Sequence, residues 1–161
     1  DVSPSKRNAS LCAGQILPDG RIGIGILETY YSETAVDDLK IAASIKAWCD
    51  IYRPKLVLHD KYTTATISER LANAGIKVQD VSGQKFYQAC GDYLDSLVNH
   101  RVVHSGQEIF IEQMNNCAAK ESDHGWRIIR RKSAGDVSAP ISLAMIVSTL
   151  MKPQSVPQIY T

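Results

Sequence analysis

The segment Lys55-Leu56-Val57-Leu58-His59-Asp60 is a short, continuously apolar run that ends on a carboxylate. A run of this kind predicts a strand that is buried on both faces of a sheet. In open α/β sheets the ligand-binding crevice lies outside the carboxyl ends of the strands, which is where Asp60 would lie. Asp60 is therefore a candidate site residue, although a turn or a helix N-cap is the commoner role for a single Asp at such a position.

The sequence on either side of this run predicts alternating strands and helices. This alternation is typical of an α/β sheet with parallel members. Residues 21–30 follow a Pro18-Asp19-Gly20-Arg21 turn and alternate in polarity, so they pair with 9–16 as a hairpin. Extended segments are also expected at 76–80, 101–104 and 124–132, and helices between the caps at 32–34 and Pro54 and at 64–74, 83–98, 106–121 and 137–151.

The composition is that of a one-domain globular protein without a strong overall charge. The chain has 161 residues, of which 44% are hydrophobic and 22% are charged, and domains cluster near about 100–150 residues. We therefore expect one domain over 1–151 and a C-terminal tail at 152–161. Lys and Arg number 18 and Asp and Glu 17, a formal charge of +1, so any contact with nucleic acid would come from local basic clusters.

The sequence lacks the signals of several common segments and sites. No apolar run approaches the roughly 18 residues that a membrane span requires, and the polar start of the chain is not a signal peptide. No GxxxxGK(S/T) motif occurs, and Gly23-Ile24-Gly25 lacks the third glycine of GxGxxG, so nucleotide hydrolysis by this chain alone is not expected. The cysteines form no CxxC pair, which favours reduced, buried thiols over a zinc site.

Two further carboxylates lie at notable positions. Asp136 directly precedes the helix at 137–151, where an N-cap is the structural alternative, and Asp1 begins the sequence, which by itself indicates nothing. Carboxylates from separate segments are of interest because a pair of divalent ions about 4 Å apart requires several of them to offset its charge. Distant segments must converge for that, since no contiguous motif in this chain supplies so many carboxylates.

A group of cations leads straight into Asp136. Four of the six residues in 127–132 are Arg or Lys, which is typical of phosphate contact that depends on salt and tolerates any sequence. A solvated charged face is the structural alternative. Two more cations lie close to Asp1. The expected DNA-contacting residues are Lys6, Arg7, Arg130, Arg131 and Lys132.

For the remaining polar candidates we favour structural roles. His59 is expected to be packed or solvated, because neighbouring strand residues point to opposite faces. His100 and His104 have the spacing of a metal pair on a helix, but their stretch predicts an extended conformation. Glu28 is expected to be an exposed residue of the hairpin.

The order and spacing of several segments resemble the C-terminal nuclease domain of the large terminase subunit of tailed bacteriophages. The resemblance covers residues 1–151, and it depends on the whole set because each segment alone is a weak signal. In that family the first acid lies within the first strand, whereas this sequence begins at it. The segments are Asp1-Val2-Ser3-Pro4 with Ala9-Ser10-Leu11, Val57-Leu58-His59-Asp60, residues 83–90 with His104, and the basic segment 126–133 with Asp136-Val137-Ser138-Ala139-Pro140.

The resemblance implies an α/β, RNase H-like fold of the resolvase and integrase type, with a five-stranded mixed sheet flanked by helices. It implies a metal-dependent DNA endonuclease that cuts concatemeric viral DNA during genome packaging into procapsids. The implied catalytic residues are Asp1, Asp60 and Asp136, which would hold two divalent metal ions, Mg²⁺ or Mn²⁺.

The same resemblance implies the partners and the place of action. The partners would be double-stranded DNA, the ATPase motor domain of the same large subunit, the portal and the small terminase subunit. No membrane partner is expected. The location would be the host bacterial cytoplasm, transiently at the procapsid portal.

Two alternatives keep other functions open. A Holliday-junction resolvase or transposase-like nuclease uses the same fold and acidic cluster, and comparing the cleavage of branched and linear duplex DNA would identify it. A non-catalytic docking module that contacts the portal or the motor domain would bind no Mn²⁺ at low millimolar concentration. A Rossmann-like nucleotide-binding domain lacks its glycine fingerprint here.

Overall fold

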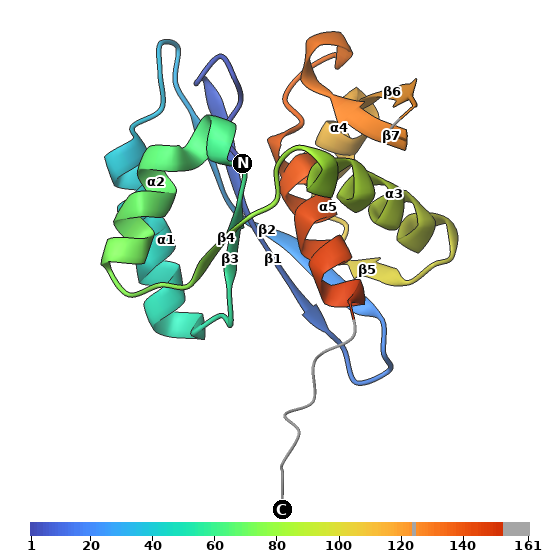
Figure 1. Ribbon diagram of the computed structural model, residues 1–161, viewed down its shortest axis with the longest axis horizontal. Coiled ribbons are helices and arrows are strands. Elements are labelled where there is room, and N and C mark those ends of the chain that lie inside the picture. Colours follow the sequence, from blue (N-terminus) through green and yellow to red (C-terminus); the bar gives the residue numbers. More distant parts are fainter. Residues whose placement is uncertain (124, 153–161) are drawn as a thin grey trace, which may run out of the picture.

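Strands and helices alternate along the chain as an α/β fold in the computed structural model, which describes residues 1–123 and 125–152 (Figure 1). The two longest strands form a central hairpin, and the other strands are short. The strands are β1 (Asn8–Ile16), β2 (Ile22–Tyr31), β3 (Val57–His59), β4 (Val78–Asp80), β5 (Val102–His104), β6 (Ala118–Ser122) and β7 (Gly125–Ile129).

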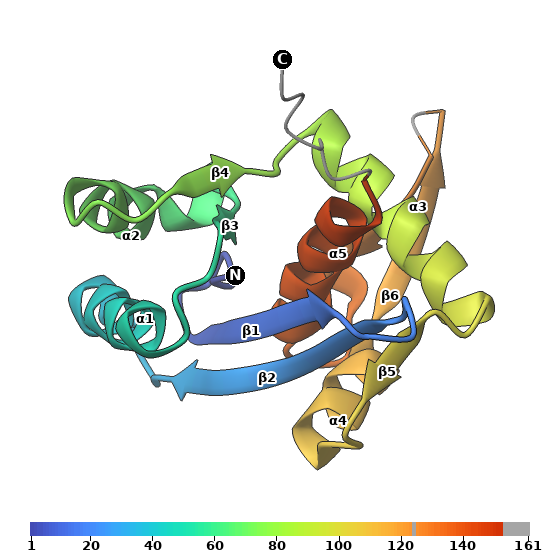
Figure 2. The same cartoon turned by 90° about the horizontal axis from the view of Figure 1, so that it is seen from below.

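The helices lie in two groups on either side of the central strands. Figures 1 and 2 show α1 and α2 on one side, and α3 and α5 on the other. A single 3₁₀ turn, η1, follows β7. The helices and this turn are α1 (Asp38–Tyr52), α2 (Lys61–Asn73), α3 (Gln84–Val98), α4 (Glu108–Asn116), η1 (Arg130–Lys132) and α5 (Ser138–Met151).

The expected hairpin is present, and its alternation decides which face is buried. β1 and β2 pair in antiparallel register from Asn8 opposite Tyr31 to Ile16 opposite Ile22. Gly20 in the connecting turn has φ +82°, a conformation that glycine adopts without steric cost. Alternate residues of β2 point into the core, and the buried ones are Ile22, Ile24 and Ile26.

Helix α5 forms the centre of the larger hydrophobic core. Most of its residues are buried, because it packs on β1 with one face and on α3 with another. Gly14 of β1 allows this close approach, since a Cβ on Gly14 would lie 2.5 Å from Ile146 Cγ2. A second core fills the space between β1, α1 and α2, and its buried members are Val2, Ala9, Ile41, Ala42, Ile45, Ile67 and Leu71.

The strands form separate sheets instead of the single five-stranded sheet expected. β1, β2 and β5 form a mixed sheet, in which β5 runs parallel to β2, and β3 pairs in parallel with β4 alone. A cleft separates β3 from β1, so Val57, Leu58 and His59 are half-buried, not buried on both faces. The α/β class with a mixed sheet is confirmed, and the five-stranded sheet is wrong for the described residues.

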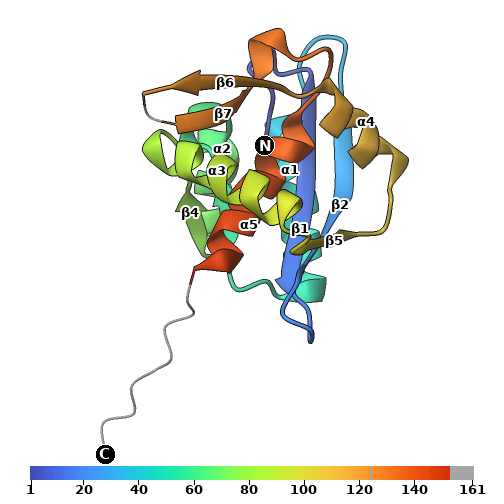
Figure 3. The same ribbon diagram turned by 90° about the vertical axis from the view of Figure 1, so that its right-hand side faces the viewer.

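The expected helix at 106–121 is also too long. α4 ends at Asn116, Cys117 is extended, and β6 then pairs in antiparallel register with β7. Figure 3 shows this second hairpin beside α3, against which β7 packs. The basic segment is therefore a strand only up to Ile129, and its last cations lie on η1.

No helix within 1–123 and 125–152 is long and apolar enough to cross a membrane.

The expectations for the end of the chain lie partly outside the described residues. The expected tail at 152–161 lies, from residue 153 on, outside the described residues, as does residue 124 of the expected extended segment. The domain boundary at 151 stays a prediction.

The contact between Gly14 and α5 predicts a cost for added volume. We expect Gly14→Ala to lower the free energy of unfolding by about 1–3 kcal/mol, because the new methyl group must push α5 away from β1. Urea unfolding followed by circular dichroism measures this change.

Gly91→Ala is the matched control. Gly91 lies on the exposed side of α3, and nothing lies within 4 Å of its added Cβ. An alanine there is expected to raise stability by about 0.5–1 kcal/mol, since glycine weakens a helix interior. Equal effects of the two substitutions would contradict the close packing of β1 on α5.

Candidate active site

The three acids singled out in the sequence come from three different elements of the fold. Asp1 precedes β1, Asp60 follows β3 directly and caps α2, and Asp136 precedes α5. Figure 1 shows the N-terminus at the ends of these elements, between the α2 side and the α5 side of the molecule. Segments that are far apart in the sequence therefore meet at one edge of the central strands.

The backbone of Asp1 is held in place by β1 and α5. Its nitrogen lies 3.0 Å from the Ser10 carbonyl oxygen and 2.8 Å from Ser142 Oγ, and its own carbonyl accepts from Ser10 N at 3.0 Å. The side chain is 0% exposed. One carboxylate oxygen, Oδ1, accepts from an Arg130 guanidinium nitrogen at 2.5 Å. The other, Oδ2, is buried with no hydrogen-bond partner.

Asp60 serves both as a helix cap and as part of the site. Oδ1 accepts from Tyr62 N at 2.9 Å, which caps the first turn of α2. Oδ2 lies 3.9 Å from the same Arg130 nitrogen that binds Asp1, and the side chain is 14% exposed. The helix N-cap role expected for Asp60 is thus confirmed, but capping uses only Oδ1 and leaves Oδ2 available to the site.

Asp136 is oriented by the first residue of α5. Ser138 donates to it twice, from its backbone nitrogen to Oδ1 at 3.0 Å and from its hydroxyl to Oδ2 at 2.8 Å. Both bonds hold the carboxylate at the start of the helix, where negative charge is favoured. Asp136 also acts electrostatically on Arg130.

Arg130 lies among the three acids. Its side chain is 25% exposed, and burial lowers its pKa while Asp60 and Asp136 oppose that shift. In the sequence it grouped with Arg131 and Lys132, but those two side chains are exposed on the turn, whereas Arg130 points into the site. One guanidinium therefore offsets the charge of the converging carboxylates.

The residues present fit a divalent metal ion in chemistry. Carboxylate oxygens are the ligands that Mg²⁺ and Mn²⁺ prefer, and Asp1 Oδ2 is a buried oxygen with no donor, an arrangement that costs free energy unless a cation satisfies it. Among the described residues, no three His, Cys, Asp or Glu side chains are grouped closely enough to hold a metal. The acids lie around Arg130, but they are not close enough to one another to coordinate one metal ion as they stand.

The other predicted DNA-contacting residues divide into bound and exposed ones. Lys6 donates to the Thr63 carbonyl at 2.9 Å and to Asp38 at 3.3 Å, so its ammonium ties the N-terminal loop to α1 and α2. Arg7 is exposed, like the outer two cations of η1. Arg127 has its guanidinium 4.9 Å from the centre of the Tyr87 ring.

The residues with expected structural roles are accounted for by specific contacts. His59 lies 3.5 Å from Thr64 Oγ1, and burial lowers its pKa. His104 packs on Phe110, with ring centres 4.7 Å apart. Glu28 is not exposed as expected, because it accepts hydrogen bonds from Ser44 and, at 3.2 Å, from Trp48 Nε1.

A buried polar chain behind the acids was not anticipated from the sequence. Gln113 Nε2 lies 3.5 Å from Ser10 Oγ, which lies 2.7 Å from Ser138 Oγ, which in turn donates to Asp136. These hydroxyls join β1 to α5 and orient Asp136. The only signal in the sequence is the presence of serines in the mostly apolar helix 138–151.

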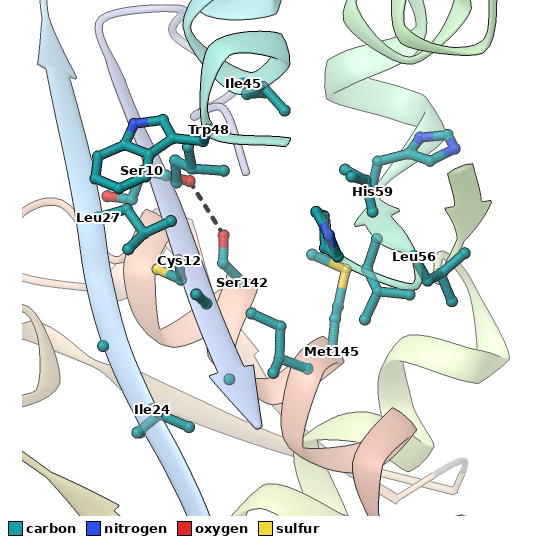
Figure 4. Close-up of a pocket in the computed structure, with 18 of the residues that line it drawn as sticks. Ser10, Cys12, Ile24, Leu27, Ile45, Trp48, Leu56, His59, Ser142 and Met145 are labelled. Atoms are coloured by element: carbon teal, nitrogen blue, oxygen red, sulfur yellow. Dashed lines mark hydrogen bonds between the residues drawn. The ribbon is translucent and has the colours of Figure 1, made fainter. Parts of the chain in front are cut away.

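A cleft of about 1260 Å³ opens beside this site, and residues of β1, α1, β3 and α5 line it (Figure 4). Figure 4 shows the hydroxyl of Ser142 directed at the Ser10 carbonyl, a contact of 3.3 Å at the wall of the cleft. Burial raises the pKa of the Cys12 thiol to about 12. This disfavours the thiolate, which is the reactive form of a cysteine.

Comparison with known protein families and with curated proteins finds no match. Solved structures are similar in fold. The HK97 bacteriophage large terminase has a TM-score of 0.80 at 12% identity, over 92% of this chain and 38% of that one. The large terminase nuclease of thermophilic phage G20c with bound magnesium has a TM-score of 0.62 at 16% identity, over 92% of this chain and 84% of that one. The nuclease domain of the Thermus phage P74-26 large terminase has a TM-score of 0.57 at 17% identity, over 91% of this chain and 80% of that one.

These likenesses show that the chain has the RNase H-like fold of large terminase nuclease domains from tailed phages, as the sequence resemblance implied. The chain spans 38% of the length of the HK97 protein. The roles of the individual site residues are not tested by these comparisons.

The polar chain behind Asp136 predicts a stability effect. We expect Ser138→Ala to lower the free energy of unfolding by about 1–3 kcal/mol, because the Asp136 carboxylate and the buried Ser10 hydroxyl both lose a partner. Thermal or urea unfolding checks this. Ser5→Ala, which changes an exposed hydroxyl, should shift stability by less than about 0.5 kcal/mol. A silent Ser138→Ala would show that the hydroxyl does not orient Asp136.

Proposed function

We propose that this chain is the nuclease domain of a phage large terminase subunit, a metal-dependent endonuclease that cuts concatemeric viral DNA during packaging into procapsids. The observation that supports this most is the convergence of Asp1, Asp60 and Asp136 around Arg130 from three elements. Side chains gathered in this way, in a fold shared with large terminase nucleases, suit phosphodiester hydrolysis.

Divalent metal ions are part of this proposal. Large terminase nucleases of phage G20c have been solved with bound magnesium and with bound cobalt. Asp1, Asp60 and Asp136 would hold two Mg²⁺ or Mn²⁺ ions in this chain. Ions bound there would supply a water of lowered pKa and charge stabilisation for the leaving oxygen.

The surrounding residues would set the positions of these carboxylates. Ser10 and Ser142 hold the backbone of Asp1, and Ser138 holds the carboxylate of Asp136, before any ligand arrives. Burial of the Asp1 side chain keeps water away from one side of the site. Such fixed geometry reduces the reorganisation needed at the moment of reaction.

Double-stranded DNA is the proposed substrate, and the exposed cations near the site would bind it. Arg131 and Lys132 lie on η1 next to the acids, and Arg7 is exposed on the loop before β1. They would contact phosphates without reading the sequence. The further partners we propose are the ATPase motor domain of the same subunit, the portal and the small terminase subunit, in the host bacterial cytoplasm and transiently at the procapsid portal.

The first test is cleavage of supercoiled plasmid in Mn²⁺, Mg²⁺ or EDTA. We expect nicking and linearisation that require the metal. Asp60→Asn and Asp136→Asn should each reduce the rate by more than roughly a hundredfold, because each removes a ligand charge and even outer partners of a metal site contribute 10–100-fold. Asp50→Asn, a change in an exposed ion pair on α1, should leave the rate unchanged.

The same assay separates the alternatives. Cleavage that survives both Asn substitutions would place the chemistry elsewhere. A strong preference for four-way junctions over linear duplex would favour a resolvase. Folded protein that neither cleaves DNA nor binds Mn²⁺ would favour a docking module.

The proposed phosphate contacts predict a change in salt dependence. Replacing Arg131 and Lys132 with Gln should weaken DNA binding and flatten the slope of log K against log salt by about 1.8, since each phosphate contact contributes about 0.9. Fluorescence anisotropy with a labelled duplex in Ca²⁺ measures the slope. Lys77→Gln is the control, because Lys77 is exposed and directly precedes β4. The other end of β4, Asp80, is the one that pairs with His59 next to Asp60. An unchanged slope in the double variant would count against contact at η1.

A further inference from the structure

Arg130 is the residue whose position the proposed function does not explain. It is the only side chain that the described structure hydrogen-bonds to the Asp1 carboxylate, at 2.5 Å. The same guanidinium nitrogen lies 3.9 Å from Asp60 Oδ2. The guanidinium therefore lies between the two carboxylates, hydrogen-bonded to Asp1 and at ion-pair distance from Asp60.

The charge of the site requires a cation at this point. The Asp1 side chain is completely buried, and a buried carboxylate is stable in its ionised form only when it is paired. Asp60 and Asp136 add negative charge that acts on the same guanidinium. Without a cation among them, these carboxylates would repel one another.

Arg130 itself is bound incompletely. Its Nε is buried without a hydrogen-bond partner, and the pair with Asp60 is at the limit of an ion pair. It belongs to η1, a single 3₁₀ turn that also carries the exposed Arg131 and Lys132. A side chain held by charge, on a short turn at the molecular surface, is suited to leaving when a stronger cation arrives.

We propose that Arg130 is an internal counter-ion that occupies the cation position of the metal-free site, and that divalent metal and Arg130 compete for Asp1 and Asp60. This inference is based on the proposed metal-dependent function. Metal binding releases the guanidinium from Asp1 towards the surface that bears the other cations of η1. There it joins them in binding the DNA phosphates, so that loading of the metal and binding of DNA favour each other.

The test is the affinity for Mn²⁺ in the absence of DNA, measured by calorimetry or by the electron paramagnetic resonance of free Mn²⁺. We expect Arg130→Gln to bind Mn²⁺ at least about tenfold more tightly than the unchanged chain, since it removes a competing charge within about 4 Å of the ligands. Arg130→Lys, which keeps the positive charge, should stay close to the unchanged chain. Arg101→Gln, which removes a charge from an exposed pair with Asp95, is the control.

A second measurement follows the metal-free protein. In EDTA, Arg130→Gln should melt at a lower temperature than the unchanged chain, because the carboxylates lose their counter-ion, and Mn²⁺ should raise its melting temperature more than that of the unchanged chain. Circular dichroism shows that each variant is folded, and the Lys variant provides the comparison if the Gln variant is not.

The outcomes distinguish this inference from the proposed function. If the unchanged chain binds Mn²⁺ and Arg130→Gln binds it equally or more weakly, Arg130 does not compete with the metal and the inference is overturned while the function stands. If neither the unchanged chain nor any variant binds Mn²⁺, the proposed function and the inference are both overturned.

Discussion

The packing of helix α5 against strand β1 is the contact on which the rest of the structure depends. Gly14 lets the two backbones approach closely, and the hydroxyls of Ser138 and Ser142 bond to Ser10 on β1. The same contact sets the place of two acids, because Asp1 leads into β1 and Asp136 leads into α5. A close-packed interior holds such distances firmly. The contact between α5 and β1 therefore forms part of the hydrophobic core and also positions the acids of the site.

Bringing three carboxylates around one guanidinium, with the Asp1 side chain fully buried, has an electrostatic cost that the chain must offset. Asp136 is satisfied by Ser138, and Asp60 by the first turn of α2, but Asp1 has one oxygen without a partner. Arg130 supplies the positive charge. The basic turn after β7 is therefore part of the site's own electrostatics through Arg130, while Arg131 and Lys132 stay exposed beside it.

Local patterns predicted the elements well where the residues themselves carry the information. The hairpin of β1 and β2, helix α3 and helix α5 lie close to the expected ranges, because alternation and helical spacing report which face is buried. The helix predicted at 106–121 was wrong beyond Asn116, because the chain there forms β6, which pairs with β7. Pairing between strands is a non-local property, and the five-stranded sheet was wrong for the same reason.

The sequence by itself determined that Asp60 and Asp136 lie at the boundaries of elements, and its order of segments resembled the nuclease fold that the solved structures share. Only the tertiary structure decided which neighbours these acids have. It placed Arg130 among the acids and tied Lys6 to Thr63 and Asp38, although both had been grouped with the DNA contacts. The reason is physical: contacts between side chains so distant in sequence are set by how the elements pack, and no local spacing records that packing.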